Sequence, residues 1–286
     1  MVSDIHSNQS ALEAVLEDAE KHGRYDLKLC PGDVVGYGPN PNEVIKILKR
    51  EGFITVLGNH DRVVRGGSAK NFNPDALSAA MYNASILSDE SRAFLERLSN
   101  VPYIDPQGRF AMVHGSFDGI AKKIDGRGKL FEDIYVRERG DFPGIPDNAK
   151  GDEIILGILG HTHIPTYAHY FMTEDDMRYG REVCIKFHRL MASDVSGLEP
   201  LVINLDFGAT PLPKAIFNPG SVGQPRNDSN RAAYGIAAID GRDITLEFRS
   251  VKYDIAETQR RMQAIGLTPE KGGFTNWLVQ RLEHGK

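Results

Sequence analysis

The sequence has little cysteine, and what it has is not spaced for a metal site or a redox pair. Its 286 residues contain two cysteines, Cys30 and Cys184, which lie far apart in the chain. Such usage excludes a disulfide framework and a thiolate metal site as organising features. We therefore expect a reducing compartment and predict a cytoplasmic location.

Long apolar runs and an excess of positive charge are also missing. No uninterrupted apolar run approaches the roughly 18 residues that a membrane helix needs, and no basic segment leads into an apolar one near the N-terminus. We expect a protein that is neither exported nor anchored in a membrane. The formal net charge of -5 gives no sign of general nucleic-acid binding. Small-molecule partners are therefore expected, and a homo-oligomer is left open.

The chain also lacks internal repeats, low-complexity runs and an evident linker. Its length suffices for a large buried core. We predict a single domain over residues 1–286, with C-terminal helices at about 254–286. The helical spacing predicts helices over 254–265 and 274–283.

The first sixty residues alternate strand and helix patterns. Apolar residues at helical spacing run from Ala11 to Ala19, and Asn40-Pro41 starts a second helix, because proline is favoured at the first helical position. Short apolar runs at 27–29 and 53–57 read as strands. This order is typical of βαβ crossovers in a parallel sheet, so we predict an α/β fold.

Later segments predict further strands. The runs 109–113 and 154–159 resemble the earlier buried strands, and the chain beyond residue 165 reads mostly as antiparallel strands. Asp240-Gly241 between two such runs indicates a hairpin.

Polar side chains of the types that bind metals follow five of the apolar runs. The five groups are Asp4/His6, Asp33, Gly58-Asn59-His60-Asp61, His114 and His161/His163. Open α/β sheets hold their ligands at the carboxyl ends of their strands. We therefore expect these groups to meet at one edge of the sheet, with the Gly58–Asp61 group on a loop.

Seven of these residues are candidate metal ligands, namely Asp4, His6, Asp33, Asn59, His114, His161 and His163. One divalent ion cannot use seven such ligands, but two can if one carboxylate bridges them. Two ions about 3.5 to 4 Å apart suit the hydrolysis of phosphate esters. His60 is free to donate a proton or to stabilise charge, and Asp61 can fix its orientation.

The motifs Asp4-x-His6, Gly32-Asp33, Gly58-Asn59-His60-Asp61, His114 and Gly160-His161-x-His163, in this order, resemble those of the calcineurin-like metallophosphoesterases. The resemblance covers roughly residues 1–250. The stretch from Asn218-Pro219-Gly220-Ser221 to Arg226 is further similar to the YfcE-type phosphodiesterase branch.

The resemblance implies a fold, a metal site and residue roles. The fold is a four-layer sandwich, with two central mixed β-sheets flanked by helices. Two divalent ions are implied, with Mn²⁺ favoured and Fe or Zn²⁺ as alternatives. By position, Asp4, His6 and His163 hold one ion, Asn59, His114 and His161 hold the other, and Asp33 bridges them. His60 acts as acid or transition-state stabiliser, with Asp61 as its partner.

The predicted function is hydrolysis of phosphomonoesters or phosphodiesters by metal-bound hydroxide. An alternative is a metal-binding scaffold of the same fold with little catalysis, and metal-dependent amide hydrolysis is a third reading. Arg62, Ser221 and Arg226 are candidate substrate contacts. For each of these three a purely structural role is an equal or stronger alternative.

The start of the chain departs from the family pattern. Only Met1, Val2 and Ser3 precede Asp4, which leaves almost no strand before the first motif. We expect a start assigned too late or a shortened chain. Four to six mostly apolar in-frame codons upstream of Met1 would support this expectation.

Overall fold

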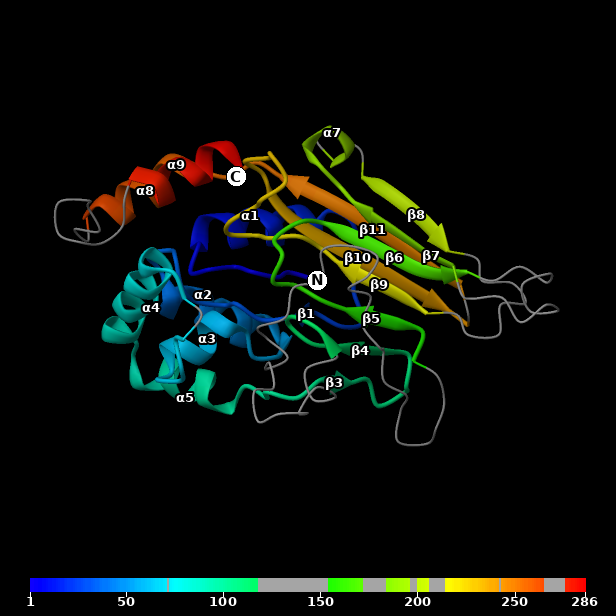
Figure 1. Cartoon of the computed structure of the whole chain (residues 1–286), viewed down its shortest axis with the longest axis horizontal. Coiled ribbons are helices and arrows are strands. Elements are labelled where there is room, and N and C mark those ends of the chain that lie inside the picture. Colours follow the sequence, from blue (N-terminus) through cyan, green and yellow to red (C-terminus); the bar gives the residue numbers. More distant parts are fainter. Residues whose placement is uncertain are drawn as a thin grey trace.

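The computed structural model describes residues 1–70, 72–117, 154–171, 184–195, 200–205, 214–241, 243–264 and 276–286. In these residues helices and β-sheets stack in layers (Figure 1). The predicted mixed α/β class is confirmed. The extent of the single domain stays a prediction.

The first part of the chain alternates helices and short strands as predicted. The elements are α1 (Gln9–Glu20), β1 (Leu29–Cys30), α2 (Pro41–Glu51) and β2 (Ile54–Thr55). β1 and β2 pair in parallel. The side chain of Asn8 caps α1 by accepting the N–H of Ala11, and α2 ends at Gly52, which has the left-handed conformation that favours glycine.

Three further helices follow, namely α3 (Asn59–Val64), α4 (Pro74–Ile86) and α5 (Asp89–Arg97). The expectation that Asn59, His60 and Asp61 lie on a loop was wrong, because they form the first turn of α3. The reason is a cap: Asp61, three residues after Gly58, accepts the backbone N–H of Gly58. This start to the helix closely follows β2, so the polar residues still emerge at the strand end.

Two larger sheets complete the fold. One has six strands in the order β3-β4-β5-β9-β6-β7, in which β4, β5 and β9 are parallel. Its strands are β3 (Tyr103–Ile104), β4 (Phe110–Met112), β5 (Leu156–Ile158), β6 (Thr166–Phe171), β7 (Cys184–Arg189) and β9 (Ala215–Asn218). The other is antiparallel in the order β10-β11-β8. Its strands are β8 (Leu201–Leu205), β10 (Ala232–Asp240) and β11 (Asp243–Val251). The predicted hairpin is confirmed, whereas β3 was not predicted.

The core forms between these layers. Phe217 of the six-stranded sheet packs against Phe248 of the three-stranded sheet, with ring centroids 4.8 Å apart. On the other face of β10, Tyr234 joins a second apolar cluster with α1 and α2. The short helix α7 (Ala192–Val195) was not predicted. The two C-terminal helices were predicted, and are α8 (Ile255–Ala264) and α9 (Asn276–His284). Residues 265, 274 and 275 of those predictions lie outside the described residues.

A cavity of about 650 Å³ lies at the amino-terminal ends of β1, β4 and β5. Its lining includes the first residue of each strand, Leu29, Phe110 and Leu156, together with Val15 and Ala19 of α1. Within the described residues, no helix combines the length and the apolarity needed to cross a membrane.

Candidate metal centre

The predicted ligands come from the carboxyl-terminal edge of the strands. Asp4 and His6 precede α1, Asp33 follows β1 and Asn59 begins α3 after β2. His114 follows β4, and His161 and His163 follow β5. All seven side chains are buried, with exposed fractions of 8% or less. The structure thus brings together residues that are up to 159 positions apart in the sequence.

The acidic and imidazole side chains form two groups that share one carboxylate. The first group is Asp4, His6, Asp33 and His163, and the second is Asp33, His114 and His161. Within each group the candidate ligand atoms lie within 4.8 Å of one another. Asn59 joins the second group, because its Oδ1 lies 3.2 Å from Nε2 of His114. Asp33 is thus the carboxylate that the two groups have in common.

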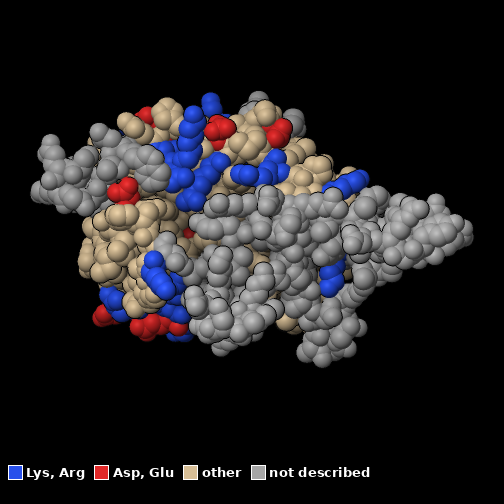
Figure 2. Space-filling model, in the orientation of Figure 1, with Lys and Arg blue, Asp and Glu red and all other residues tan. Residues whose placement is uncertain are grey.

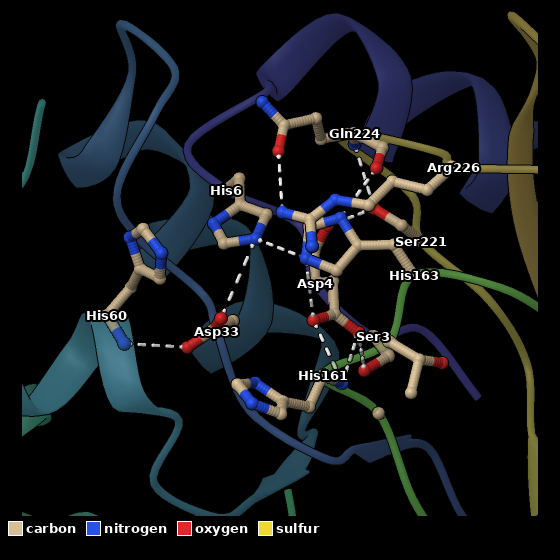
Figure 3. A network of polar contacts seen from close by, with 12 residues as sticks. Ser3, Asp4, His6, Asp33, His60, His161, His163, Ser221, Gln224 and Arg226 are labelled. Carbon is tan, nitrogen blue, oxygen red and sulfur yellow. Dashed lines mark hydrogen bonds and ion pairs between the residues drawn. The ribbon is translucent and has the colours of Figure 1, made fainter. Parts of the chain in front are cut away.

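Figure 3 shows the first group, in which the His6 ring faces the shared carboxylate of Asp33 and the His163 ring faces Asp4. Oδ2 of Asp33 lies 3.6 Å from Nε2 of His6 and 3.3 Å from Nε2 of His114. Oδ1 of Asp4 lies 3.3 Å from Nε2 of His163. The backbone N–H of His161 donates to both oxygens of Asp4 at 3.1 Å. Asp4 therefore holds the 161–163 loop as well as facing the first group.

Backbone contacts fix which nitrogen of three imidazoles faces the centre. Nδ1 of His6, His114 and His163 lies 3.1, 2.7 and 2.6 Å from the carbonyl oxygens of Val35, Pro31 and Gln224. A carbonyl only accepts hydrogen bonds, so each Nδ1 carries the proton. In the neutral ring, Nε2 then presents a lone pair to the centre.

These lone pairs make a cation the fitting occupant. Nε2 of His6 and Nε2 of His163 lie 3.1 Å apart. Two lone pairs at this distance repel each other unless a positive charge lies between them. Neutral imidazoles and carboxylates without thiolates suit manganese, iron or zinc. The residues present therefore fit divalent metal ions.

The pKa values follow from burial and from the crowding of charges. Burial lowers the pKa of His6 and of His163 well below the usual range, so both rings are neutral. Burial raises the pKa of Asp4 to about 7. Burial alone would also raise the pKa of Asp33, but the nearby imidazoles of His114 and His60 hold it well below its usual value. The shared carboxylate is thus the one that stays ionised most readily.

The pKa of His114 is raised, in contrast to that of His6 and His163. Burial would lower its pKa, but the carboxylates of Asp33 and Asp4 raise the pKa to about 10. Without another cation, the second group therefore attracts a proton. A proton on His114 takes the place that a metal ion would hold.

The ligand loops carry unusual backbone strain. Among the described residues, eight non-glycine residues have positive φ, and seven of them belong to the loops of this centre. Five are predicted ligands, namely Asp4, His6, Asp33, His161 and His163. A left-handed backbone costs a non-glycine residue on the order of 1–2 kcal/mol, and such strain gathers at functional sites.

Two glycines permit the close approach of these loops. A Cβ at Gly58 would overlap Asp33, and a Cβ at Gly160 would overlap Ser3 beside Asp4. The glycines that precede two of the motifs are therefore required by packing around the ligand side chains.

His60 lies beside the centre, with its backbone and its ring in different roles. Its backbone N–H donates to Oδ1 of Asp33 at 2.9 Å, and Figure 3 shows the ring extending away from that carboxylate. The ring centroid lies 4.7 Å from His6, 4.5 Å from Tyr37 and 4.6 Å from Phe72. Burial lowers the pKa of His60 to about 4, so the ring is neutral at pH 7.

Asp61 has partners other than the one predicted. One carboxylate oxygen accepts the N–H of Val35 and the other accepts the N–H of Gly58, both at 3.0 Å. Burial raises the pKa of Asp61 to about 6, and these two hydrogen bonds oppose the rise. In the described structure Asp61 therefore ties the 33–36 loop to α3 and does not orient the His60 ring through a hydrogen bond.

The three candidate substrate contacts lie in different settings. Ser221 is fully buried, and its hydroxyl donates to the carbonyl of Asp4 at 2.8 Å, so it supports the loop that carries Asp4. The substrate contact expected of Ser221 stays a prediction. Nη1 of Arg62 donates to the carbonyl of Ser68 within its own segment.

Arg226 lies beside the metal centre. It is half-buried and donates to Oε1 of Gln224 at 3.2 Å (Figure 3). Its charge also adds to burial in lowering the pKa of His163. The cation is therefore close enough to influence the ligand set.

Sequence reasoning missed several supporting residues. The hydroxyl of Ser3 donates to Oδ2 of Asp4 at 2.5 Å. Gln224 receives the Nδ1–H of His163 through its backbone carbonyl. Neither residue is of a type that binds metals, and backbone contacts leave no mark on the sequence pattern. Only the glycine-rich stretch around Gln224 gave a signal.

Comparison with known proteins finds one matching family and one relative that is similar over the whole chain. The sequence model of the calcineurin-like phosphoesterase family matches residues 1–191. The uncharacterized protein MJ0912 of Methanocaldococcus jannaschii is 30% identical over 293 residues, which cover 100% of this chain and 97% of that protein.

Two solved structures are similar over the full chain. A metallophosphoesterase from Sphaerobacter thermophilus is 31% identical with a TM-score of 0.66, covering 100% of this chain and 98% of that chain. The hypothetical protein PH1004 from Pyrococcus horikoshii OT3 is 17% identical with a TM-score of 0.62, covering 100% and 97%. The similarity to PH1004 supports the fold alone. The narrower YfcE-type branch stays a prediction.

Proposed function

Because the chain belongs to the calcineurin-like phosphoesterase family, we propose that it hydrolyses phosphomonoesters or phosphodiesters with the help of two divalent metal ions. The observation that carries the proposal is the pair of ligand groups that share the carboxylate of Asp33. A single structural ion would need no second group of ligands on the far side of that carboxylate.

Each ligand has a defined place in this proposal. Asp4, His6 and His163 would hold one ion, and His114, His161 and the amide oxygen of Asn59 would hold the other. Asp33 would contact both. When bound, such a pair polarises a phosphoryl oxygen and lowers the pKa of a water molecule.

His60 supplies the group that does not bind metal. A ring with a pKa of about 4 is neutral at pH 7, and nearby cations would lower that pKa further. The neutral ring carries one N–H, which can donate to an oxygen on which negative charge develops. We therefore assign His60 as donor and stabiliser rather than as a permanently charged acid.

The surroundings favour an anionic substrate. Arg226 lies next to the centre, and its charge lowers the pKa of His6, His60, His161 and His163 in addition to the effect of burial. Figure 2 shows Lys and Arg side chains gathered in a band on the face drawn there, near the C-terminal end of α9 and the loop after β9. A small phosphate ester is the proposed substrate, and Arg226 is a proposed contact.

Metal identity and substrate can be tested together. The purified chain is loaded with Mn²⁺, Fe²⁺ or Zn²⁺, its metal content is measured, and turnover is followed on bis-p-nitrophenyl phosphate, p-nitrophenyl phosphate and an amide panel. We expect two ions per chain, with Mn²⁺ giving the highest phosphate-ester turnover. Two bound ions with no turnover on any phosphate ester would favour the scaffold alternative. Cleavage of amides alone would favour metal-dependent amide hydrolysis.

The narrower expectations stay predictions. They comprise the choice of Mn²⁺, the YfcE-type branch, the small-molecule partner and the cytoplasmic location.

A further inference from the structure

Asn83 is a fully buried amide on α4 that contacts two loops of the metal centre. Its Oδ1 accepts the hydroxyl of Ser7 at 2.5 Å and the backbone N–H of Gly36 at 2.8 Å. Its Nδ2 donates to the carbonyl of Gly38 at 2.9 Å. One side chain therefore fastens the loop that carries His6 to the loop that follows Asp33.

The two loops also bond to each other at this point. The N–H of Gly38 donates to the carbonyl of His6 at 2.9 Å, and the N–H of Asn40 donates to the carbonyl of Ser7 at 3.0 Å. Ser7 and Tyr37 both have a left-handed backbone, with φ of 53° and 52°. Such conformations persist only where surrounding contacts impose them, and Asn83 supplies contacts on both loops.

The fastened loops position the ring of His60. The centroid of Tyr37 lies 4.5 Å from that of His60 and 4.7 Å from that of His6. A Cβ at Gly36 would overlap the His60 ring, which shows how closely this loop covers it. Because Asp61 bonds to backbone N–H groups instead, the orientation of His60 depends on packing by Tyr37, Phe72 and the 36–38 loop.

We propose that Asn83 is a positioning residue that acts on the reaction through His60, by holding the 36–38 loop and Tyr37 against the His60 ring. The inference rests on the proposed phosphoesterase function for its kinetic consequences only. The hydrogen bonds of Asn83 go to Ser7, Gly36 and Gly38 and to no metal ligand side chain. Its loss should leave the ions in place and misalign the ring.

The first experiment compares graded substitutions in the Mn²⁺-loaded full chain. Asn83→Leu keeps the approximate volume and removes all three hydrogen bonds, whereas Asn83→Asp keeps both acceptor contacts and replaces the donor to Gly38 with a carboxylate oxygen. We expect kcat to fall by roughly 10–100-fold in Asn83→Leu, as for other supporting residues, and by less in Asn83→Asp. KM and the metal content should stay within about twofold of the unsubstituted chain.

The second experiment asks whether the effect passes through His60. Residues that act as a unit show non-additive losses. In a His60→Gln background, Asn83→Leu should therefore lower kcat by less than about threefold. A full additional loss in that background would overturn the proposal.

A control separates positioning from general destabilisation. Leu95→Ala removes a fully buried apolar side chain from α5 and leaves all three hydrogen bonds of Asn83 to the two loops in place. At an equal loss in Tm, Leu95→Ala should retain its kcat. An equal fall in kcat for both variants would show that Asn83 matters only for stability.

The final measurement does not need turnover. In chain loaded with Zn²⁺ and labelled with ¹⁵N-histidine, the ring signals of His60, assigned by their loss in His60→Gln, should shift or broaden in Asn83→Leu and stay in place in Leu95→Ala. Unchanged His60 signals in Asn83→Leu would overturn the proposal even if the chain hydrolyses no phosphate ester. Failure of the proposed function alone would leave this signal change intact.

Discussion

The two ends of the central strands differ in almost every physical respect. At their carboxyl ends, β1, β4 and β5 deliver ionisable side chains to one buried centre with a strained backbone. At their amino ends the same strands border a cavity of about 650 Å³ whose lining includes Leu29, Phe110 and Leu156. This cavity is thus not where the reactive groups gather.

The candidate metal ligands and the cavity thus lie at opposite ends of the same strands. Lone pairs and carboxylates converge where the loops hold them, so a cation is needed there to balance the charges. The cavity at the other end offers space but no comparable set of metal ligands among its lining residues. Substitutions at the carboxyl ends should therefore change metal binding and turnover, and substitutions at the amino ends should change stability.

The largest effect is expected from Asp33→Asn. The change removes the only carboxylate common to both ligand groups, so both ions should be lost. Metal analysis should show almost no bound ion, and turnover should fall by more than the roughly 10–100-fold typical of supporting residues. Retention of two ions would contradict the bridging role.

The next largest effect is expected from His60→Gln. The ligand side chains are untouched, so metal content should stay at the unsubstituted value. Turnover should fall by about 100-fold or more, within the range for loss of a positioned proton donor. Parallel metal and kinetic measurements distinguish this variant from Asp33→Asn, and a loss of ions would contradict the assignment.

A smaller effect, on stability alone, is expected from Ala19→Leu at the amino-terminal end. Ala19 lines the cavity from α1, so a larger apolar side chain can fill empty space. Filling a cavity commonly adds about 1 kcal/mol to the free energy of unfolding, or roughly 3 °C in Tm for a chain of this size. Glu17→Leu on the exposed face of α1 is the matched control and should give no such gain. A change in kcat for Ala19→Leu would contradict the claim that the amino-terminal ends affect stability but not turnover.

The smallest effect concerns Cys30, the last residue of β1. Burial raises the pKa of its thiol, so the reactive thiolate is scarce at pH 8. The folded chain should resist alkylation by iodoacetamide at Cys30, with no change in turnover, whereas the urea-unfolded chain should react. Peptide mass spectrometry reports the modified fraction. Rapid modification of the folded chain would contradict the burial.

Much of the centre could be predicted because its signals are local. Apart from Asp4 and His6, the ligands follow an apolar strand run within a few residues, so the pattern Asp33 after β1 or His114 after β4 is visible in the sequence. The first turn of α3 was missed because a capping carboxylate and a catalytic carboxylate look alike in the pattern, and Asp61 proved to cap.

Other features depend on contacts across the fold. Asn83 is 47 positions from Gly36 and 76 from Ser7, and nothing near Asn83 in the sequence marks these partners. Ser221 lies in a motif that suggested substrate binding, yet its hydroxyl holds the carbonyl of Asp4 217 positions away. Tertiary packing decides such roles, so sequence patterns alone could not assign them.

The hydrogen bonds from Nδ1 of His6, His114 and His163 to backbone carbonyls have a thermodynamic consequence. The rotational freedom of these rings is lost when the chain folds, and little remains to be lost when a ligand arrives. The affinity of the centre is thus largely set in advance by the architecture. Weakening those carbonyl contacts should show up chiefly as an unfavourable binding entropy in calorimetry.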